Sequence, residues 1–165
     1  MIQTHLRQLS PADGALFREL RLEALQRNPE AFASTFESES TQPLSWFEDR
    51  LKKADVFGAF RDSELMGIAG YVTQEGLKHK HKGLLWGMYV RPSARNAGIG
   101  HALAEAVVNH ARERVVLIQL CVVSENEFAR RLYTSLGFIE YGIEKHALKQ
   151  NDRYYDDVLM AKALT

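Results

Sequence analysis

The chain has 165 residues, and 21 Lys and Arg residues balance 21 Asp and Glu residues, which gives a formal net charge of +0. This length suits one domain over residues 1–165 whose core needs no disulfide or metal, and the neutral balance does not favour a nucleic-acid or anionic-membrane partner. The single cysteine, Cys121, excludes an intramolecular disulfide, and no apolar run reaches the roughly 18 residues of a membrane span, so we expect a cytoplasmic protein.

The first part of the chain predicts a strand followed by a helix. The strand is expected over Ile2–Gln8. The segment Ser10–Asp13 has the composition of a helix start, because serine can cap, proline suits the first helical position and aspartate can hydrogen-bond back. The helix ends near Asn28 and carries apolar residues at helical spacing, namely Leu16, Phe17, Leu20, Ala24 and Leu25.

The segment Glu30–Leu44 is rich in Ser and Thr and has weak periodicity, but it contains Phe32 and Phe36. These two rings either fill the core or shape a substrate pocket, and the sequence leaves both interpretations open. A second, short helix is predicted from Ser45 to Lys53.

Two strands, Val56–Phe60 and Leu65–Val72, alternate around a turn at Asp62 and predict a hairpin. The segment after this hairpin contains His79 and His81, which could face a metal ion from one side of a strand. Lysines surround both histidines and no third ligand is apparent, so we expect a solvated loop and no metal.

The next segment predicts a strand, a glycine-containing loop and a helix in that order. The apolar run Leu84–Val90 is typical of a strand, Pro92 ends it, and Gly98 and Gly100 lead into the helix. The helix carries apolar residues spaced for one buried face, namely Leu103, Ala106, Val107 and Ala111.

This order of elements favours an anion-binding site. The first N–H groups of a helix have no partner within it, the helix dipole is positive there, and glycines let a phosphate approach the amides. Arg95 adds a formal positive charge. Gly100 is not followed by the Lys of a P-loop, and Leu103 stands where a dinucleotide-binding motif needs its third glycine, so both of those phosphate sites are excluded.

The run Val115–Val123 is almost entirely apolar and predicts a central strand covered on both faces, with Cys121 as a small core residue. After it, Asn126 begins a helix over Phe128–Leu136, as its cap, as an amide that binds a ligand, or as both. The rest of the chain predicts a last hairpin with the strands Phe138–Leu148 and Tyr155–Ala163.

Two motifs on these elements together resemble the GNAT superfamily of N-acetyltransferases. The first is Arg95-x-x-Gly98-x-Gly100, and the second is Asn126-x-x-Ala129-x-x-Leu132-Tyr133-x-x-x-Gly137-Phe138. The stretch from Pro29 to Glu39 further resembles a bacterial GNAT subgroup whose substrates are mostly unassigned. The resemblance covers the entire chain and implies a three-layer α/β (α+β) fold, with a mixed sheet of about six or seven strands, about four flanking helices and the order β-α-α-β-β-β-α-β-α-β-β.

The resemblance implies an N-acetyltransferase that uses acetyl-CoA, needs no metal, and acts by direct transfer on a primary amine of a small molecule or a peptide. It also implies a homodimer through the last hairpin. The residues expected to bind the cofactor are Met88, Tyr89, Val90, Arg95, Asn96, Ala97, Gly98, Ile99, Gly100, Asn126 and Tyr133.

By the same resemblance, Tyr133 is the general acid toward the leaving thiolate, although a tyrosine at this spacing could also be an ordinary amphipathic anchor. The general base is less defined, because Trp86-Gly87-Met88 lacks the glutamate that many members carry on this strand. Glu37 and Glu39 are candidates for the base, as is a chain of water molecules that ends at backbone carbonyls. The candidates for the acceptor pocket are Phe32, Phe36, Glu39 and Tyr155.

Two other classes of function stay open at this point. The missing strand glutamate would suit a non-catalytic acyl-CoA-binding module that reports the cofactor level to a partner protein. The glycine loop would also suit a nucleotide-binding α/β protein that holds a different phosphate. The acceptor amine, and the use of acyl groups other than acetyl, are left open by the sequence.

Overall fold

The computed structural model describes residues 3–165 of the chain. Three short 3₁₀ turns, η1 (Pro11–Asp13), η2 (Pro29–Ala31) and η3 (Pro92–Ala94), accompany the main elements. The helices and strands are, in chain order, β1 (Thr4–Gln8), α1 (Gly14–Arg27), α2 (Phe36–Ser40), α3 (Leu44–Lys53), β2 (Asp55–Arg61), β3 (Glu64–Thr73), β4 (Lys82–Val90), α4 (Ile99–Arg112), β5 (Leu117–Val123), α5 (Glu127–Ser135), β6 (Ile139–Gln150) and β7 (Arg153–Ala163).

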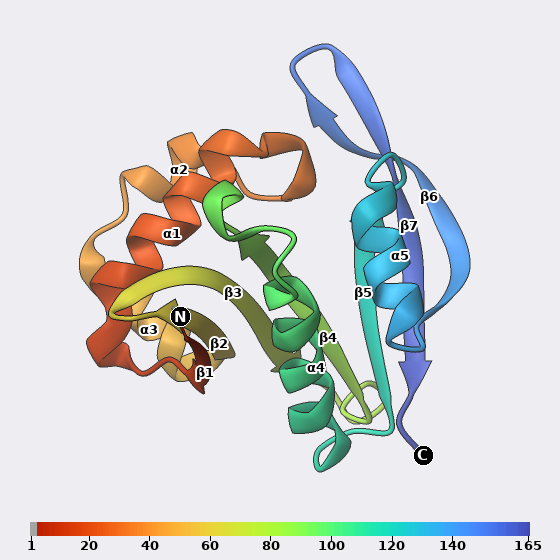
Figure 1. The fold of residues 1–165 in the computed structure, drawn as a ribbon. Helices are drawn as coiled ribbons and strands as arrows, with labels where there is room; N and C mark the ends of the chain where they lie inside the picture. Colours follow the sequence, from red (N-terminus) through yellow and green to blue (C-terminus); the bar gives the residue numbers. More distant parts are fainter. Residues whose placement is uncertain (1–2) are drawn as a thin grey trace.

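All seven strands of the described residues join one mixed sheet in the order β1-β2-β3-β4-β5-β7-β6 (Figure 1). Every neighbouring pair is antiparallel except β4 and β5, which are parallel and are connected through α4. The predicted mixed sheet and the predicted order of elements are confirmed. Ile2, the first residue of the predicted first strand, lies outside the described residues.

The structure adds one helix to the predicted order, the five-residue α2. It lies in the Ser- and Thr-rich segment whose periodicity is weak. Thr35 caps it, because its Oγ1 accepts a hydrogen bond from the Ser38 N–H at 3.1 Å. The hydroxyl side chains that weaken the helical pattern therefore provide the start of this short helix.

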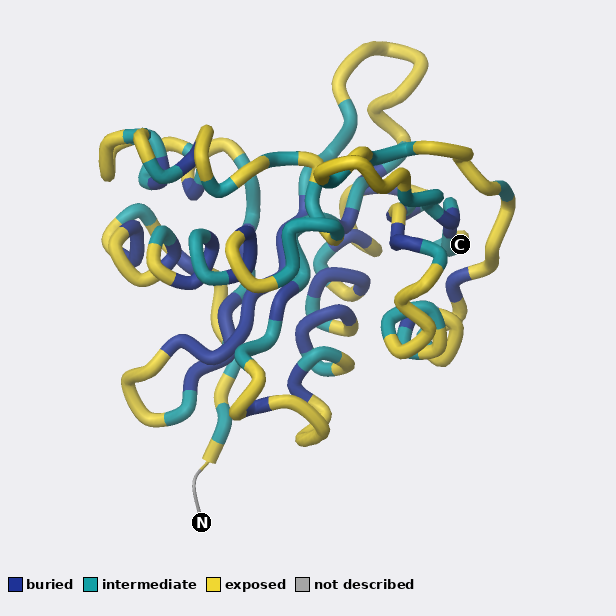
Figure 2. Tube along the Cα trace, turned by 90° about the horizontal axis from the view of Figure 1, so that it is seen from above, coloured by how far each residue is buried: buried dark blue, intermediate teal, exposed yellow. Residues whose placement is uncertain are grey.

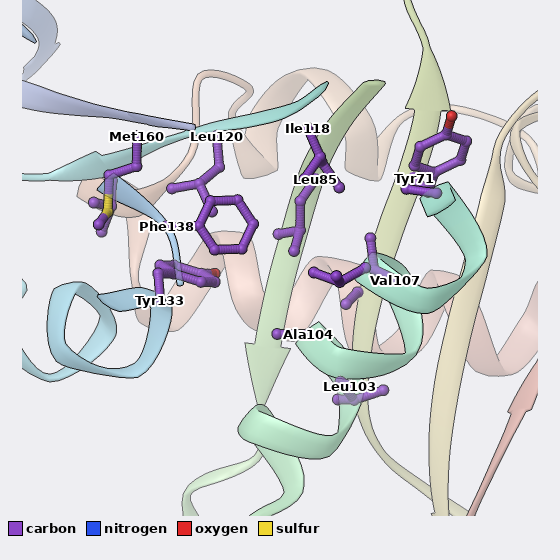
Figure 3. Packing of buried hydrophobic residues seen from close by; sticks show 14 of the residues in the cluster. Tyr71, Leu85, Leu103, Ala104, Val107, Ile118, Leu120, Tyr133, Phe138 and Met160 are labelled. Carbon is purple, nitrogen blue, oxygen red and sulfur yellow. The ribbon is translucent and has the colours of Figure 1, made fainter. Parts of the chain in front are cut away.

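Each face of the sheet packs its own apolar core. One core joins α4 and α5 to the strands from β2 to β5 and to β7, and Figure 3 shows side chains of α4 facing Leu85 and Ile118. The other core joins α1 and α3 to the sheet through fully buried residues such as Phe17, Leu20 and Phe47. Figure 2 shows that helix residues turned toward the sheet are buried, whereas those turned outward are exposed. The sheet is therefore the middle layer of three.

One face of β5 is open, so the prediction that both faces of this strand are covered is wrong. In the described part of the chain, the core beneath α1 and α3 reaches no further across the sheet than β4. Cys121 alternates onto the open face and is exposed, so its assignment to the core is also wrong. Partial desolvation, with Asp157 and Glu144 nearby, raises the pKa of the Cys121 thiol, which therefore keeps its proton.

The parallel strands β4 and β5 pair only at their first residues and then separate. Pairing stops at Leu84 opposite Gln119, although β4 continues to Val90 and β5 continues to Val123. Within this unpaired part, a bulge with Gly87 at φ +68° bends β4. The divergence of the two strands creates the space in which the candidate site lies.

Candidate functional site

A cleft of about 540 Å³ opens between the diverging ends of β4 and β5. Its walls come from the end of β4, the loop before α4, the first turns of α5 and the 3₁₀ turn η2. The cleft thus brings together segments that are far apart in the sequence. The lining residues that the sequence had suggested are Phe32, Met88, Tyr89, Val90, Arg95, Asn96, Gly100, Asn126 and Tyr133.

The loop before α4 presents a row of unpaired backbone amides beside this cleft. The first hydrogen bond of the helix runs from the Ala102 N–H to the Gly98 carbonyl oxygen at 3.0 Å. Within residues 3–165, the N–H groups of residues 96–101 have no backbone partner. The positive end of the helix dipole lies behind these amides, so together they form a site for an anion.

Backbone conformation explains why Asn and Gly occupy this loop. Asn96 and Gly98 have φ values of +63° and +79°, a left-handed region that these two residue types tolerate best. A Cβ atom at Gly98 would have no heavy atom within 4 Å. Glycine is therefore favoured here by its positive φ and by the access it leaves to the amides. Such a Cβ atom would not clash with any neighbouring residue of the described chain. A Cβ atom at Gly100 would lie 3.4 Å from Leu132 Cδ1, where α4 approaches α5.

Arg95 is held at the edge of the cleft. Its Nε donates to the Val90 carbonyl oxygen at 2.9 Å, and its Nη2 donates to Asn28 Oδ1 at 3.5 Å. Its guanidinium carbon also lies 5.7 Å from the centroid of the Tyr89 ring. These contacts keep a positive charge beside the free amides. The Val90 carbonyl oxygen thus already accepts one hydrogen bond from Arg95.

The Tyr89 side chain ties β4 to α1. Its hydroxyl donates to Glu23 Oε2 at 2.8 Å. Burial and this neighbouring carboxylate raise the pKa of Tyr89 to about 12, so the phenol stays protonated. The hydroxyl is therefore committed to the fold, although the residue lines the cleft.

Asn126 caps α5 from the opposite wall of the cleft. Its Oδ1 accepts a hydrogen bond from the Ala129 N–H at 3.2 Å. Its side-chain nitrogen has no hydrogen-bond partner among the described residues. This geometry caps the helix and leaves the side-chain nitrogen free for a ligand, so the two roles that the sequence allowed together are compatible.

Tyr133 lies deeper in the same wall and is only 5% exposed. Its ring packs edge-on against Phe138 with centroids 5.7 Å apart (Figure 3). Burial strongly raises the pKa of the phenol, and its hydroxyl makes no hydrogen bond within the described chain. The cleft therefore contains a neutral tyrosine whose proton is not engaged elsewhere.

The two carboxylates suggested by the sequence do not line the cleft. Glu37 is exposed on α2. Glu39 is 2% exposed and accepts two hydrogen bonds from Arg21, at 3.0 and 2.9 Å. Burial alone would raise the pKa of Glu39, but hydrogen bonds from Arg21 and Ser34 and the positive charges of Arg21 and Arg50 together outweigh it, and the pKa is lowered. Glu39 is thus an ionised partner of Arg21 beneath the surface.

Two other carboxylates, which the sequence did not single out, do line the cleft. Glu125 precedes α5 and forms an ion pair with Arg153 from the tip of the last hairpin. Glu30 belongs to η2 and has no cationic partner among the described residues. No local pattern distinguishes Glu30 from the other acidic residues of its segment, because only the tertiary path of η2 brings it to the cleft.

The aromatic candidates for the acceptor pocket also divide into one that lines the cleft and two that do not. Phe32 packs on the core beneath α1 and also lines the cleft, and its role in an acceptor pocket stays a prediction. Phe36 and Tyr155 are half-buried and do not line it. The Tyr155 ring instead lies under the Arg153 guanidinium, 4.7 Å from the guanidinium carbon to the ring centroid.

The described residues contain no group of three or more His, Cys, Asp or Glu side chains that could hold a metal ion. No helix among residues 3–165 is long and apolar enough to span a bilayer.

Comparisons with known proteins agree with this geometry. The family model for the acetyltransferase (GNAT) family matches residues 18–138. The chain is 32% identical over 123 residues to the mycothiol acetyltransferase of Thermomonospora curvata and 30% identical over 146 residues to that of Acidothermus cellulolyticus. These matches cover 73% and 81% of this chain but only 39% and 43% of the relatives, so the chain spans about two fifths of their length.

Solved structures share the fold over nearly the whole chain. An acetyltransferase of the GNAT family from Streptococcus pneumoniae superposes with a TM-score of 0.86 at 20% identity, over 99% of this chain and 100% of that one. A putative acetyltransferase from Salmonella typhimurium, solved with acetyl-CoA, gives a TM-score of 0.82 at 20% identity, over 99% and 95% of the two chains. At this level of identity the likeness concerns the fold.

Proposed function

The chain belongs to the GNAT family of acetyltransferases, and we propose that it transfers the acetyl group of acetyl-CoA directly to a primary amine of a small molecule or a peptide. The family and the fold expected from the sequence are confirmed. A non-catalytic acyl-CoA sensor gains no support, because the matched relatives are named as acetyltransferases. The cytoplasmic location and a homodimer through β6 and β7 stay predictions.

The observation that carries this proposal is the row of free amides at residues 96–101, which opens beside the gap between β4 and β5. Coenzyme A needs a site for its diphosphate and a slot for a long arm that contains amides. The free amides and Arg95 suit the diphosphate. The unpaired edge of β4 near Met88 and the free side-chain nitrogen of Asn126 suit the amide-bearing arm.

Bound acetyl-CoA supplies an acetyl group whose carbonyl carbon exchanges its bond to sulfur for a bond to the amine nitrogen. For a neutral amine, one proton leaves the nitrogen and a second is delivered to the sulfur, and an ammonium form must lose a further proton before it can attack. We assign the second proton to Tyr133, because its buried phenol has a raised pKa and is protonated at neutral pH. Its hydroxyl is free of other hydrogen bonds within the described chain, so nothing competes for this role.

The proton on the attacking amine requires an acceptor, because amines are largely protonated near neutral pH. We assign this role to Glu30 in place of Glu37. Glu30 lines the cleft and has no cationic partner among the described residues, whereas Glu37 is outside the cleft. A carboxylate in this position also attracts the cationic form of the acceptor toward the site.

The proposal is tested by ligand binding and turnover on the same preparation. We expect CoA and acetyl-CoA, but not ATP or NAD, to raise the melting temperature, and we expect thiol release from acetyl-CoA when a panel of amines and peptides is added. Stabilisation by ATP or NAD without CoA would overturn the proposal in favour of a nucleotide-binding protein. Tight CoA binding with no turnover on any acceptor would favour the sensor.

A further inference from the structure

A second polar cluster lies on the other side of β4, beneath α1, α2 and α3. We call Arg21, Glu39, Trp46, Arg50 and Trp86 the arginine cluster. The Arg50 guanidinium carbon lies 4.7 Å from the Trp86 ring centroid and 5.1 Å from that of Trp46, so the cation is flanked by two indoles. None of the proposed roles in acetyl transfer uses this cluster.

The arginine cluster has more positive than negative charge. Glu39 accepts both of its short hydrogen bonds from Arg21 and lies 3.5 Å from Arg50 Nη1, so two guanidinium groups share one carboxylate. The Arg50 side chain is 28% exposed, whereas those of Arg21 and Glu39 are 5% and 3% exposed. Burial and the charge of Arg21 lower the pKa of Arg50, which means that its cation lacks full compensation. An additional anion would supply it.

Hydrogen-bond donors are also in surplus here. The Trp86 Nε1 is buried and has no hydrogen-bond partner among the described residues. Buried N–H groups are normally satisfied, so an unpaired one marks a place for a missing acceptor. Arg21 Nη1 lies 3.7 Å from the position that a Cβ on Gly87 would occupy, and it makes no hydrogen bond within residues 3–165. The cluster therefore has more hydrogen-bond donors than acceptors, and the free donor of Arg21 lies beside the bulge of β4.

The arginine cluster adjoins the cofactor cleft. Phe32 lines that cleft, and its ring centroid lies 5.2 Å from the Arg21 guanidinium carbon. Met88, directly after the bulge at Gly87, lines the cleft from β4. A small acceptor that approached the cleft beside Phe32 and the bulge would therefore bring its other end to the arginine cluster.

We propose that the acceptor is an amine that also carries a carboxylate, as amino acids do, and that the Arg50 guanidinium, held between Trp46 and Trp86, binds this carboxylate. This inference rests on the proposed acetyl transfer and specifies its substrate class. Arginine suits the role because its planar fork can give a carboxylate two charge-assisted hydrogen bonds. The second arginine and the free indole N–H reinforce the same preference for an anion.

The first test compares acceptors that differ only in the carboxylate. Acetyl transfer is measured with common L-amino acids and with their carboxamides. The carboxamides have the less basic and so more readily deprotonated amines, which would favour them if the carboxylate were not recognised. We expect the amino acids to have a kcat/KM about ten- to a hundredfold higher. Equal values, or a preference for the carboxamides, would overturn the inference and leave the acetyltransferase proposal intact.

Arg50→Gln provides the matched variant, because Glu39 keeps Arg21 as its partner and no buried carboxylate is left unpaired. We expect this variant to lose the preference for amino acids while its affinity for CoA is unchanged. Arg112→Gln, at an exposed position on α4, is the control and should keep the preference. A preference that survives in Arg50→Gln would also overturn the inference.

A second readout does not depend on turnover. The chain has only two tryptophans, and both flank Arg50, so tryptophan emission, excited at a wavelength that tyrosine does not absorb, reports on this cluster. With the protein saturated with CoA, we expect non-aromatic L-amino acids to change the emission saturably, and their carboxamides or Arg50→Gln to abolish that change. No response to any L-amino acid would overturn the inference. Failure of CoA itself to bind would instead contradict the proposed function.

Discussion

Arg21 and Glu39 join α1 to α2 through two hydrogen bonds, from Nε to Oε1 at 3.0 Å and from Nη2 to Oε2 at 2.9 Å. Both side chains are almost fully buried. Because η2 lies between these two helices and lines the cleft, this ion pair fixes the segment that forms one wall of the site. The pair is thus a link between the stability of the fold and the shape of the cleft.

We expect Glu39→Ala to lower the free energy of unfolding by about 3–5 kcal/mol, because it leaves the Arg21 cation buried without its partner. Urea denaturation followed by circular dichroism measures the loss. Glu37→Ala, on the exposed side of the same helix, is the control and should change stability by no more than about 0.5 kcal/mol. Similar losses in the two variants would show that the ion pair does not hold this segment.

We expect Gly98→Asp to raise the Kd for CoA by roughly a hundredfold, which corresponds to about 2.8 kcal/mol. The side chain would place negative charge beside the amides proposed to bind diphosphate, and the φ of +79° would strain it. Calorimetric titration measures the affinity. Gly76→Asp is the matched control, since Gly76 also has positive φ (+98°) but lies in the turn before β4, away from the cleft. A folded Gly98→Asp protein with unchanged affinity would remove the amide row from the cofactor site.

Local signals in the sequence were sufficient to predict the elements that form the proposed cofactor side of the cleft. The loop from Arg95 to Gly100 follows a strand and opens a helix, and both properties are visible as composition and spacing. Asn126 and Tyr133 are likewise placed by the helix that contains them. The position of each of these residues is set by one loop or helix and by the strand that precedes it. The order of the elements along the chain is therefore enough to bring them to one cleft.

The acceptor side could not be predicted in this way. Which carboxylate reaches the cleft depends on the path of the chain from η2 to α2, and a buried ion pair between residues 18 positions apart sets that path. The sequence does carry a signal for this pair. Arg21 stands four residues from both Phe17 and Leu25, on the apolar face of α1, where a charged residue requires a buried partner.

We expect Tyr133→Phe to lower kcat by about a hundredfold or more while the Kd for CoA stays within about twofold. The variant removes only the hydroxyl, so packing against Phe138 is kept. The raised pKa of Tyr133 means that the phenol keeps its proton well above its ordinary titration range. The wild-type rate should therefore show no alkaline decline from this residue. Tyr141→Phe, at an exposed position, is the control. Equal turnover in Tyr133→Phe would exclude the hydroxyl as the acid.

The pH dependence of stability tests the ion pair between Arg7 and Asp13, neither of which lines the cleft. Hydrogen bonds from Arg7 at 2.8 and 2.9 Å lower the pKa of Asp13 from 3.8 to about 2. Because the folded-state pKa lies below the unfolded value, the stabilisation is present above pH 3.8 and is lost as the pH falls through about 2. The shift corresponds to about 2 kcal/mol, and the half-exposed Arg7 reduces the expected effect to about 1 kcal/mol. Asp13→Asn should lose about this amount at neutral pH, and its deficit against the wild type should shrink in acid. A deficit that does not change with pH would contradict the ion-pair origin.

The assignment of Glu30 as the proton acceptor predicts a loss of turnover that is specific to this carboxylate. Glu30→Gln keeps the size and polarity of the side chain but cannot accept the proton, so kcat should fall by about a hundredfold with CoA affinity unchanged. Because the amine must then lose its proton to water, the remaining activity should recover as the pH approaches the pKa of the acceptor amine. Glu37→Gln, on the exposed side of α2, is the matched control and should keep the wild-type rate and pH profile. If Glu37→Gln lost activity and Glu30→Gln did not, the base would have to come from α2, and η2 would serve only as a wall of the cleft.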